Sequence, residues 1–307
     1  MYTNKVIAVL GPTASGKTEL TLNIAQKFNA VVINCDSRQL YSEMLIGTAS
    51  PSDEEKKLAE HRLFNFLSPA VMYSAYDYSE TAVKEIKKVW AENKLPILTG
   101  GTGFYYSSVA EGLGQAESNP DLAEALKQEL YQKGLNTMIE KLKVLDPGAI
   151  STIDLNNPRR VLRALEIVIS TKKPFAENTK KAPLPEADFF PIVVTRNRDE
   201  LHKRIEKRID FMFEAGLVDE AKNIIEKYGK DASALSSIGY RELIGYYDGS
   251  ITLPQAKEQI LFHTRQYAKR QETWFRKNPG VAMTNLDQPN CIDNILTSTS
   301  QFLKTHI

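Results

Sequence analysis

The stretch GPTASGKT, residues 11–18, has the spacing G-x-x-x-x-G-K-[ST] of a phosphate-binding loop. Its glycines let the backbone approach an anion closely, and the amides from Thr13 to Thr18 form an anion nest at the start of a helix. We expect Lys17 to bridge the terminal phosphate oxygens and Thr18 to ligate Mg²⁺. The predicted anion-binding residues are therefore Gly11, Pro12, Thr13, Ala14, Ser15, Gly16, Lys17 and Thr18.

The loop does not identify the organic group that carries the phosphates, and two other strand ends bear on that question. The apolar run AVVINC, residues 30–35, leads into Asp36, at the end of a strand where parallel sheets bind ligands. Its carboxylate faces the phosphates or a second substrate, or else it is a residue around magnesium or a helix cap.

The run PILT, residues 96–99, leads into Gly100-Gly101-Thr102. Many nucleotide hydrolases place a metal-binding acid on this strand, so glycines and a hydroxyl there weaken an ATPase interpretation. By residue type alone, Thr102 is either a site residue or the N-cap of the next helix.

Basic residues cluster on three predicted helices. Arg159 and Arg163 share one face of the first, with Arg160 beside them, and Arg204 and Arg208 share one face of the second. The third helix, TRQYAKRQETWFRK, carries Arg265, Lys269, Arg270, Arg276 and Lys277, with Tyr267 and Trp274 a heptad apart and only Glu272 to balance the charge. Such clusters usually mark a solvated face, but arginines beside aromatic residues also suit RNA. Composition alone leaves these two interpretations even.

Alternating strand and helix patterns must position these residues. Strands are predicted at residues 5–10, 30–35, 96–99 and 189–195, with a helix over 19–28 and another over 74–93. This order predicts an α/β fold, a P-loop-type parallel sheet flanked by helices. Between the third and fourth strands only helical patterns occur, and each begins at an Asn-Pro or Asp-Pro pair: Asn119-Pro120, Asp146-Pro147 and Asn157-Pro158.

We therefore divide the chain into a first part of the core at 1–117, an all-helical insertion at 118–188 and a second part of the core at 189–307. In the second part, helices are expected around 198–215, 218–227 and 254–277, followed by a short strand and a helix.

Composition limits the class of protein. Apolar residues make up 42% and charged residues 25%, as in ordinary globular proteins, and the formal net charge is +1. No apolar run is long enough to span a bilayer and the N-terminus lacks the pattern of a signal peptide, so we expect a cytoplasmic protein with no membrane contact. Cys35 and Cys291 are too far apart in sequence for a CxxC metal site, and two cysteines fit a reducing compartment.

Seven motifs in a fixed order carry a family resemblance: GPTASGKT, INCDSRQLY followed by IGTASP, LTGGTGFY, RRVLRALEI, RIEKRIDFMFEAGLVDEA, SIGYREL and TRQYAKRQETWFR. Together they resemble the bacterial tRNA dimethylallyltransferases, also called tRNA isopentenyltransferases. The resemblance runs from Val6 to about Arg276, which is nearly the whole chain. Several of these motifs are specific to the family, whereas the phosphate loop alone is not.

The resemblance implies a prenyl transfer reaction. A dimethylallyl group passes from dimethylallyl diphosphate to N6 of the adenosine at tRNA position 37, beside the anticodon, and pyrophosphate leaves. It further implies that Asp36 is the general base and that Thr102 lies beside it at the target adenine. Arg208 is expected to help hold the diphosphate, although physics alone does not separate Arg208 from Arg204. The insertion is expected to grip the anticodon stem-loop of tRNA, and the enzyme is expected to be a monomer that uses Mg²⁺.

By the same resemblance, RNA contacts are expected at residues 36–39 and 159–163, besides the basic residues of the third helix. The complete predicted tRNA-binding set is Asp36, Ser37, Arg38, Gln39, Thr102, Arg159, Arg160, Val161, Leu162, Arg163, Arg265, Lys269 and Arg270.

Two positions depart from the family pattern. Where the family often reads GTAKP, this chain has Ser50, and where it has an acidic residue after a His-rich segment, this chain has Asn65 in HRLFN.

The chemistry of the residues agrees with this assignment. The exocyclic amine of adenine is a poor nucleophile, so a carboxylate that removes its proton lowers the barrier. The departing pyrophosphate needs the loop amides, Lys17, Thr18 with Mg²⁺ and an arginine. Three alternatives remain open: a small-molecule kinase that uses ATP, an isopentenyltransferase acting on free adenine nucleotides, and a nucleotide-binding RNA-interaction protein without chemistry.

Overall fold

The computed structural model describes residues 2–114, 116, 118–178, 180–277 and 283–305. The chain forms two compact units, one made of residues 1–110 and 183–307 and the other of residues 111–182. The expected insertion of 118–188 therefore begins and ends somewhat earlier in the structure. Each unit has its own hydrophobic core.

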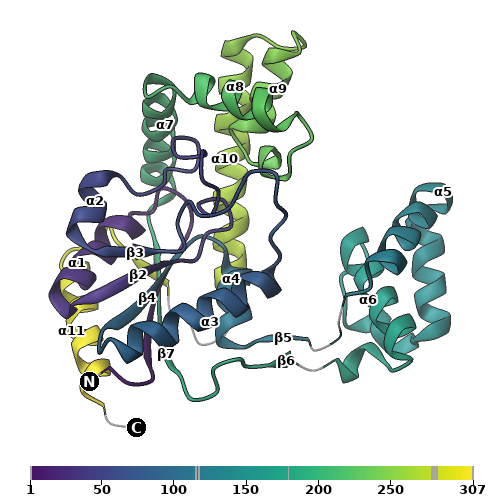
Figure 1. The fold of residues 1–307 in the computed structure, drawn as a ribbon, viewed down its shortest axis with the longest axis horizontal. Helices are drawn as coiled ribbons and strands as arrows, with labels where there is room; N and C mark the ends of the chain where they lie inside the picture. Colours follow the sequence, from purple (N-terminus) through teal and green to yellow (C-terminus); the bar gives the residue numbers. More distant parts are fainter. Residues whose placement is uncertain (1, 115, 117, 179, 278–282, 306–307) are drawn as a thin grey trace. The chain divides into compact units, whose positions relative to one another are not determined.

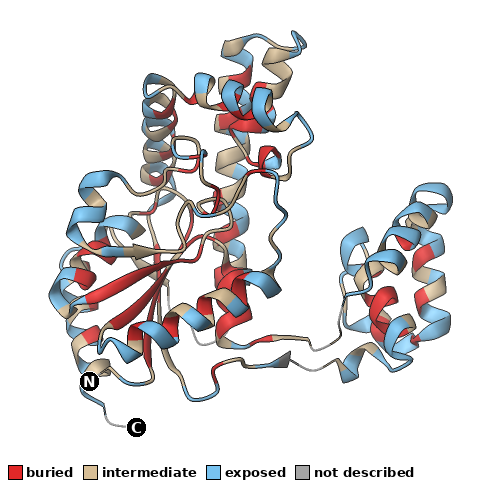
Figure 2. Ribbon diagram, in the orientation of Figure 1, coloured by how far each residue is buried: buried red, intermediate tan, exposed pale blue. Residues whose placement is uncertain are grey.

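The first unit is built on a six-stranded sheet whose paired strands all run parallel, in the order β3-β2-β4-β1-β7-β8 (Figure 1). The strands are β1 (Lys5–Leu10), β2 (Ala30–Asn34), β3 (Glu60–Arg62), β4 (Leu95–Gly100), β7 (Asp188–Thr195) and β8 (Met283–Asn285). Every residue of β1 and β2 is buried, because a parallel sheet is covered on both faces. Figure 2 shows the red colour of buried residues along strands of this sheet. This confirms the predicted α/β fold and the four strands expected from apolar runs.

Alternate residues of β1 point to opposite layers. Val6 and Ala8 pack with the helices α3 (Ala75–Ala91) and α4 (Gly103–Ala110). Ile7 and Val9 pack with α1 (Lys17–Phe28) and α11 (Cys291–Lys304) on the other face. The sheet is thus fixed between two helical layers, and its strand ends are held rigidly.

A third core in this unit joins helices that follow β7. It unites α7 (Arg198–Glu214), α8 (Leu217–Tyr228), the 3₁₀ turn Ser233–Ser236, α9 (Tyr240–Tyr247) and α10 (Leu253–Arg276). Of these helices, α7, α8 and α10 were predicted and α9 was not. The short α2 (Asp53–Leu58), elsewhere in the unit, was also not predicted.

The second unit is helical, with α5 (Pro120–Leu145), α6 (Pro158–Thr171) and the 3₁₀ turns Pro147–Ser151 and Phe175–Glu177, and a two-stranded antiparallel pair of β5 (Leu113–Gly114) and β6 (Lys180–Lys181). The predicted caps at Asn119 and Asn157 are confirmed, since each side chain accepts hydrogen bonds from amides of the first helical turn. Asp146 also caps, but it begins a 3₁₀ turn where a longer helix was expected.

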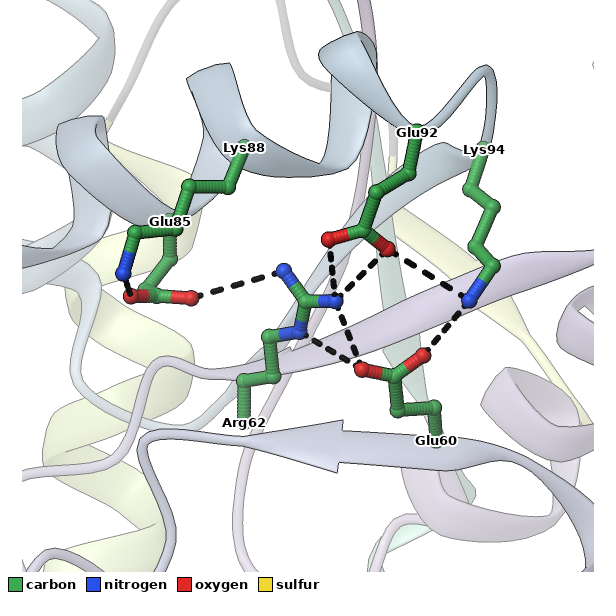
Figure 3. A network of polar contacts seen from close by, with 6 residues as sticks. All are labelled: Glu60, Arg62, Glu85, Lys88, Glu92 and Lys94. Atoms are coloured by element: carbon green, nitrogen blue, oxygen red, sulfur yellow. Dashed lines mark hydrogen bonds and ion pairs between the residues drawn. The ribbon is translucent and has the colours of Figure 1, made fainter.

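The edge strand β3 is tied to neighbouring elements by a network of ion pairs (Figure 3). Arg62 pairs with Glu60, Glu85 and Glu92, at 2.6, 3.5 and 2.8 Å respectively, and Lys94 pairs with Glu60 and Glu92. Exposed pairs contribute little individually, but a shared arginine with several partners fixes geometry. The network holds the short β3 against α3 and the start of β4, and so supports the segment that follows it.

Candidate functional site

The phosphate loop lies where predicted, between the end of β1 and the start of α1. Gly11 allows a close approach, because a Cβ there would lie 2.3 Å from the carbonyl oxygen of Val194 in β7. Gly16 occupies the N-cap position of α1 with a positive φ of 102°. The helix therefore begins at Lys17, with its first amides directed toward the loop.

Two amides of the expected anion nest, those of Thr13 and Ser15, are already engaged within the protein. The N–H of Thr13 donates to Oε1 of Gln271 in α10 at 2.9 Å. The N–H of Ser15 also donates within the loop, to the carbonyl oxygen of Pro12 at 3.4 Å, so these two amides must exchange a partner before they can bind a ligand. Gln271 itself was not among the predicted site residues, although it lies within the motif TRQYAKRQETWFR.

Lys17 is partly buried in the loop, and its Nζ donates to the carbonyl oxygen of Pro12 at 2.7 Å. Burial lowers the pKa of Lys17 to about 8, with an opposing contribution from the negative charge of Asp36 and a further lowering by Arg208. An anion bound in the loop would add a compensating charge. Lys17 is thus poised to bind phosphate oxygens in exchange for the Pro12 carbonyl.

Asp36 is held in one orientation by backbone amides. Oδ1 accepts from the N–H of Arg38 at 2.9 Å and Oδ2 from the N–H of Gly101 at 3.3 Å. No helix follows Asp36 directly, so the helix-cap alternative is wrong. The carboxylate instead closes an Asx turn after β2, and Gly101, the residue that follows β4, supplies the second donor.

Thr102 lies beside Asp36 and turns its hydroxyl toward the same turn. Its Oγ1 accepts from the N–H of Ser37 at 3.0 Å and contacts the Ser37 hydroxyl at 3.2 Å. The N-cap alternative for Thr102 is wrong for the side chain, because only its carbonyl oxygen serves the first turn of α4. The predicted pair of Asp36 and Thr102 is therefore brought together, with Ser37 between them.

The glycines around Thr102 are explained by packing. A Cβ at Gly100 would lie 2.0 Å from the carbonyl oxygen of Cys35, and one at Gly101 would lie 2.2 Å from Nε2 of Gln271. At Gly103 it would lie 2.1 Å from the ring of Trp274. The motif GGTG thus allows β2 and α10 to close on the strand end that carries Thr102.

Helix α10 contributes a second residue that the sequence interpretation did not assign. Tyr267 forms a hydrogen bond with Thr102, and burial, followed by the charge of Asp36, raises its pKa. Its phenol therefore stays neutral near the carboxylate. The ring also lies 5.8 Å from the guanidinium of Arg270.

Three arginines surround the phosphate loop in different ways. Nε of Arg196, which follows β7, donates to the carbonyl oxygen of Ser15 at 2.9 Å, and Nε of Arg204 donates to that of Ala14 at 2.9 Å. Arg208 contacts only the carbonyl oxygen of Thr48 in this way, at 3.4 Å, and burial lowers its pKa. Arg204 and Arg208 both line a cavity of about 640 Å³ against the phosphate loop, and Arg208 also lines the larger cavity that contains Asp36. Arg196, which follows a strand, was not predicted.

The segment 44–50 forms another wall of the site and is fixed from α8. The carboxylate of Glu220 accepts from three consecutive amides, those of Leu45, Ile46 and Gly47, at 2.8, 2.8 and 3.0 Å. It also accepts from the hydroxyl of Tyr240 at 2.6 Å. Glu220 and Tyr240 lie in the motifs GLVDEA and SIGYREL. The sequence therefore singled out both motifs but did not indicate that they anchor the segment 44–50.

The predicted residues Arg38 and Gln39 lie at the same site. Nε2 of Gln39 donates to the carbonyl oxygens of Thr48 and Ala49, at 3.2 and 2.7 Å. Gln39 therefore stabilises the segment 44–50 through these two hydrogen bonds, and it is also a candidate contact to tRNA.

A single cavity of about 940 Å³ joins these parts. It is lined by Lys17 and Thr18 at the phosphate loop, by Asp36, and by Arg208 from α7. At α10 it is lined by Tyr267 and Arg270, among others. A cavity of this size is suited to a small organic diphosphate together with a base-sized second substrate.

The basic face of α10 is only partly free. Lys269 and Arg270 are exposed, but Arg265 pairs with Glu206 of α7 at 3.5 Å. Glu272, the residue expected to balance the cluster, turns away and accepts from the hydroxyl of Thr195 at 3.0 Å. The expectation that Glu272 alone balances this helix is therefore wrong, because the balancing carboxylate comes from a neighbouring helix.

The helical unit presents some of its predicted RNA contacts and buries others. Arg159 and Arg160 are exposed on the first turn of α6, and Leu162 is partly buried against the core. Val161 is fully buried in that core, so its side chain offers no surface to RNA. Arg163 pairs with the buried Glu166 at 2.7 Å and donates to the carbonyl oxygen of Ala116. For Val161 and Arg163 the structure thus indicates a packing role.

Among the described residues, no cluster of three or more His, Cys, Asp and Glu is arranged to hold a metal ion. Cys35 and Cys291 are both buried and free. No helix in the described part of the chain is long and apolar enough to cross a membrane.

Comparison with known proteins gives one consistent result. The family model described as IPP transferase matches residues 39–278. The chain is 39% identical over 308 residues to a tRNA dimethylallyltransferase from Acetivibrio thermocellus, with 98% of each chain covered. It is 38% identical to one from Christiangramia forsetii, covering 93% of this chain and 94% of that one.

Solved structures agree with the sequence comparison. A full-length tRNA isopentenylpyrophosphate transferase from Bacillus halodurans is similar with a TM-score of 0.74 at 34% identity, covering 98% of this chain and 97% of that one. A eukaryotic dimethylallyltransferase, described as acting on tRNA, reaches a TM-score of 0.82 at 25% identity and covers 98% of this chain and 80% of that one. The similarity extends over the entire α/β fold and its helical unit.

Proposed function

Because this chain belongs to the IPP transferase family, we propose that it transfers a dimethylallyl group from dimethylallyl diphosphate to N6 of the adenosine at tRNA position 37 and releases pyrophosphate. This is a prenyltransferase reaction of tRNA modification. The ATP-dependent kinase alternative has no support among the curated relatives above, which are named tRNA dimethylallyltransferases.

One observation carries the proposal: Asp36 and the phosphate loop open into the same cavity, and the Asp36 charge acts on Lys17. A carboxylate and an anion cradle in one cavity suit a reaction in which a proton is removed at one end and a diphosphate leaves at the other. The same cavity reaches Tyr267 and Arg270 on α10, beside the face proposed for RNA.

Asp36 is the proposed general base. Both of its oxygens are oriented by backbone amides, which fixes the carboxylate without neutralising it. It would accept the proton from N6 as the carbon–nitrogen bond forms and the bond from carbon to the diphosphate oxygen breaks. Thr102 lies within the same hydrogen-bonded turn and is the proposed contact to the adenine.

The leaving diphosphate is the proposed ligand of the loop amides, Lys17 and Arg208. Both Arg204 and Arg208 line the cavity against the phosphate loop, but only Arg208 also lines the cavity of Asp36. The guanidinium of Arg204 is already hydrogen-bonded to Ala14, so we propose Arg208 as the ligand. Their positive charges stabilise the charge that develops on the leaving group.

A magnesium ion fits this donor set. The exposed Thr18 lies at the cavity and offers a hydroxyl oxygen, and Mg²⁺ typically combines few protein ligands with phosphate oxygens and water. Thr18 would hold the ion, which would neutralise charge on the diphosphate when bound.

Exposed basic residues on both units are the proposed RNA contacts. They are Arg159 and Arg160 on α6 and Lys269 and Arg270 on α10, together with the turn of Ser37, Arg38 and Gln39 beside Asp36. Arg265 is retained as a weaker candidate, since it is shared with Glu206. An adenine flipped out of the anticodon loop would reach the cavity of Asp36. We place the enzyme in the cytoplasm, where tRNA is found, and propose that it acts as a monomer.

Incubation with Mg²⁺, unmodified tRNA and either dimethylallyl diphosphate or ATP tests the proposal. We expect one dimethylallyl mass increment on the tRNA, located at adenosine 37 by nuclease digestion and mass spectrometry. Asp36→Asn should lose the transfer while it retains tRNA binding, and Asp77→Asn, a change on α3 outside the cavity, serves as the matched control. ATP turnover without prenylation, or modification of free adenine nucleotides in place of tRNA, would refute it.

A further inference from the structure

Gln271 forms a bridge between two parts of the site that are far apart in sequence. It is 5% exposed, in the middle of α10. Its Oε1 accepts from the N–H of Thr13 in the phosphate loop at 2.9 Å, and its Nε2 donates to the carbonyl oxygen of Gly101 at 2.9 Å. Both polar atoms of the side chain are thus engaged, each with a different wall of the site.

Gly101, the second partner of Gln271, is itself hydrogen-bonded to Asp36, the proposed general base. The carbonyl oxygen of Gly101 accepts a hydrogen bond from Gln271, and the N–H of Gly101 donates to Oδ2 of Asp36 at 3.3 Å. The path therefore runs from the phosphate loop through one buried amide side chain to the carboxylate. An amide can serve both ends because it carries one donor and one acceptor group.

Glycine at position 101 leaves the space that this arrangement requires. A Cβ at Gly101 would lie 2.2 Å from Nε2 of Gln271 and 3.3 Å from Oδ2 of Asp36. Glycine at position 101 is thus what permits the amide and the carboxylate to approach the same peptide from two sides.

We infer that Gln271 is a positioning residue that sets the distance between the diphosphate cradle and the base at Asp36. The inference rests on the proposed function, because it assigns Gln271 a purpose only if Asp36 and the loop act in one reaction. Gln271 contacts no reacting atom; it acts through Thr13 on one side and Gly101 on the other.

Two substitutions separate positioning from simple packing. Gln271→Met keeps the length of the side chain and removes both hydrogen bonds. Gln271→Glu keeps the acceptor for Thr13 but, when ionised, presents a second oxygen to the carbonyl of Gly101. When protonated, the acid donates to that carbonyl again.

The charged groups around this position decide how the Glu variant titrates. Asp36 is reached through Gly101, and Lys17 interacts with Asp36 from the loop. Glu272, the next residue of α10, turns its carboxylate to Thr195. The nearest charge along the bridge is thus negative, which together with burial favours the protonated form of a glutamate at position 271.

The experiment measures single-turnover prenyl transfer at saturating tRNA and dimethylallyl diphosphate. For Gln271→Met we expect a rate loss of about 10- to 100-fold, as for a small misplacement of reacting groups. Affinity for tRNA should stay within about twofold of the parent, because the buried side chain touches no RNA surface. Gln259→Met, an exposed glutamine on the same helix, is the control and should retain the parent rate.

The pH profile gives the second readout. The rate of Gln271→Glu relative to the parent should rise as the pH is lowered from about 8.5 to about 6, since the protonated acid restores the bond to Gly101. A purely structural defect would give a ratio that does not depend on pH, and this result would overturn the inference. A parent-like rate for Gln271→Met would overturn it as well.

Asp36→Asn, measured in parallel, distinguishes a failure of the inference about Gln271 from a failure of the proposed function. If that variant is inactive while Gln271→Met is fully active, the inference fails and the proposed function stands. If Asp36→Asn transfers the prenyl group at the parent rate, the assignment of the base fails, and the bridge loses the purpose assigned to it.

Discussion

Nδ2 of Asn65 donates a hydrogen bond of 2.9 Å to the hydroxyl of Ser50. These are the two positions at which the resemblance leads us to expect a departure from the family pattern. A neutral hydrogen bond thus joins these two positions in this chain. Nδ2 of Asn65 also donates to the carbonyl oxygen of Tyr41 at 3.0 Å, and its buried Oδ1 has no hydrogen-bond partner among the described residues.

The first prediction is that these two positions are energetically coupled. Asn65→Asp alone removes the donor to Tyr41 and introduces an unpaired charge, so it should lower the free energy of unfolding by about 1–3 kcal/mol. Adding Ser50→Lys supplies a cation, which should restore at least about 1 kcal/mol. Urea denaturation of the parent, both single variants and the double variant measures the coupling. Strictly additive effects would contradict it.

The second prediction separates RNA contacts from packing on α6. Arg159→Ala and Arg160→Ala change exposed side chains, and each should weaken tRNA binding and reduce the slope of log affinity against log salt by about 1. Arg163→Met should instead destabilise the helical unit by about 1–3 kcal/mol, because the buried Glu166 loses its cation. Filter binding at several salt concentrations and thermal unfolding measure the two effects. An unchanged salt slope in the first two variants would exclude them as phosphate contacts.

The elements that were predictable are those with a local signal. Strand β1 is a continuous buried apolar run, and the turn from it into α1 carries the spacing of the phosphate loop, so both could be found within one short window. The short β3 and α2 were not predicted, because three and six residues carry too little periodicity.

The site residues that we did not predict have no local signal in the sequence, because their partners are far away in the chain. Gln271 is 258 residues from Thr13 and 170 from Gly101 in the chain. Glu220 is likewise 173 residues from Gly47. A hydrogen bond of this kind leaves no spacing pattern, so residue type suggests a polar helix face until the sheet and the helices have been assembled. The same applies to the pairing of Arg265 with Glu206, which lies on another helix.

The third prediction concerns the anchor of the segment 44–50. Glu220→Gln keeps one acceptor oxygen and replaces the other with an NH₂ group, which can only donate. The side chain can then no longer accept from all three backbone amides of Leu45, Ile46 and Gly47. The loosened segment carries the Thr48 carbonyl that holds Arg208, so KM for dimethylallyl diphosphate should rise about 3- to 10-fold with a smaller change in kcat. Glu226→Gln, an exposed change on the same helix, is the matched control. Equal kinetics for the two variants would show that the segment does not depend on Glu220.

The fourth prediction follows from the pKa of Lys17, which burial lowers to about 8, against the attraction of Asp36. Only the protonated lysine attracts a diphosphate, and the bound anion favours protonation, so binding above the folded pKa takes up a proton. The Kd of dimethylallyl diphosphate should therefore stay nearly constant below about pH 8 and weaken by up to about tenfold per pH unit above it. Isothermal titration calorimetry in buffers of different ionisation enthalpy measures both the affinity and the proton uptake. Lys17→Met should bind more weakly with no such dependence on pH, because it carries no titrating group at this position. A parent affinity that is the same at about pH 7 and about pH 9.5 would mean that Lys17 keeps its proton throughout this range, and the contribution of its burial to diphosphate binding would have to be abandoned.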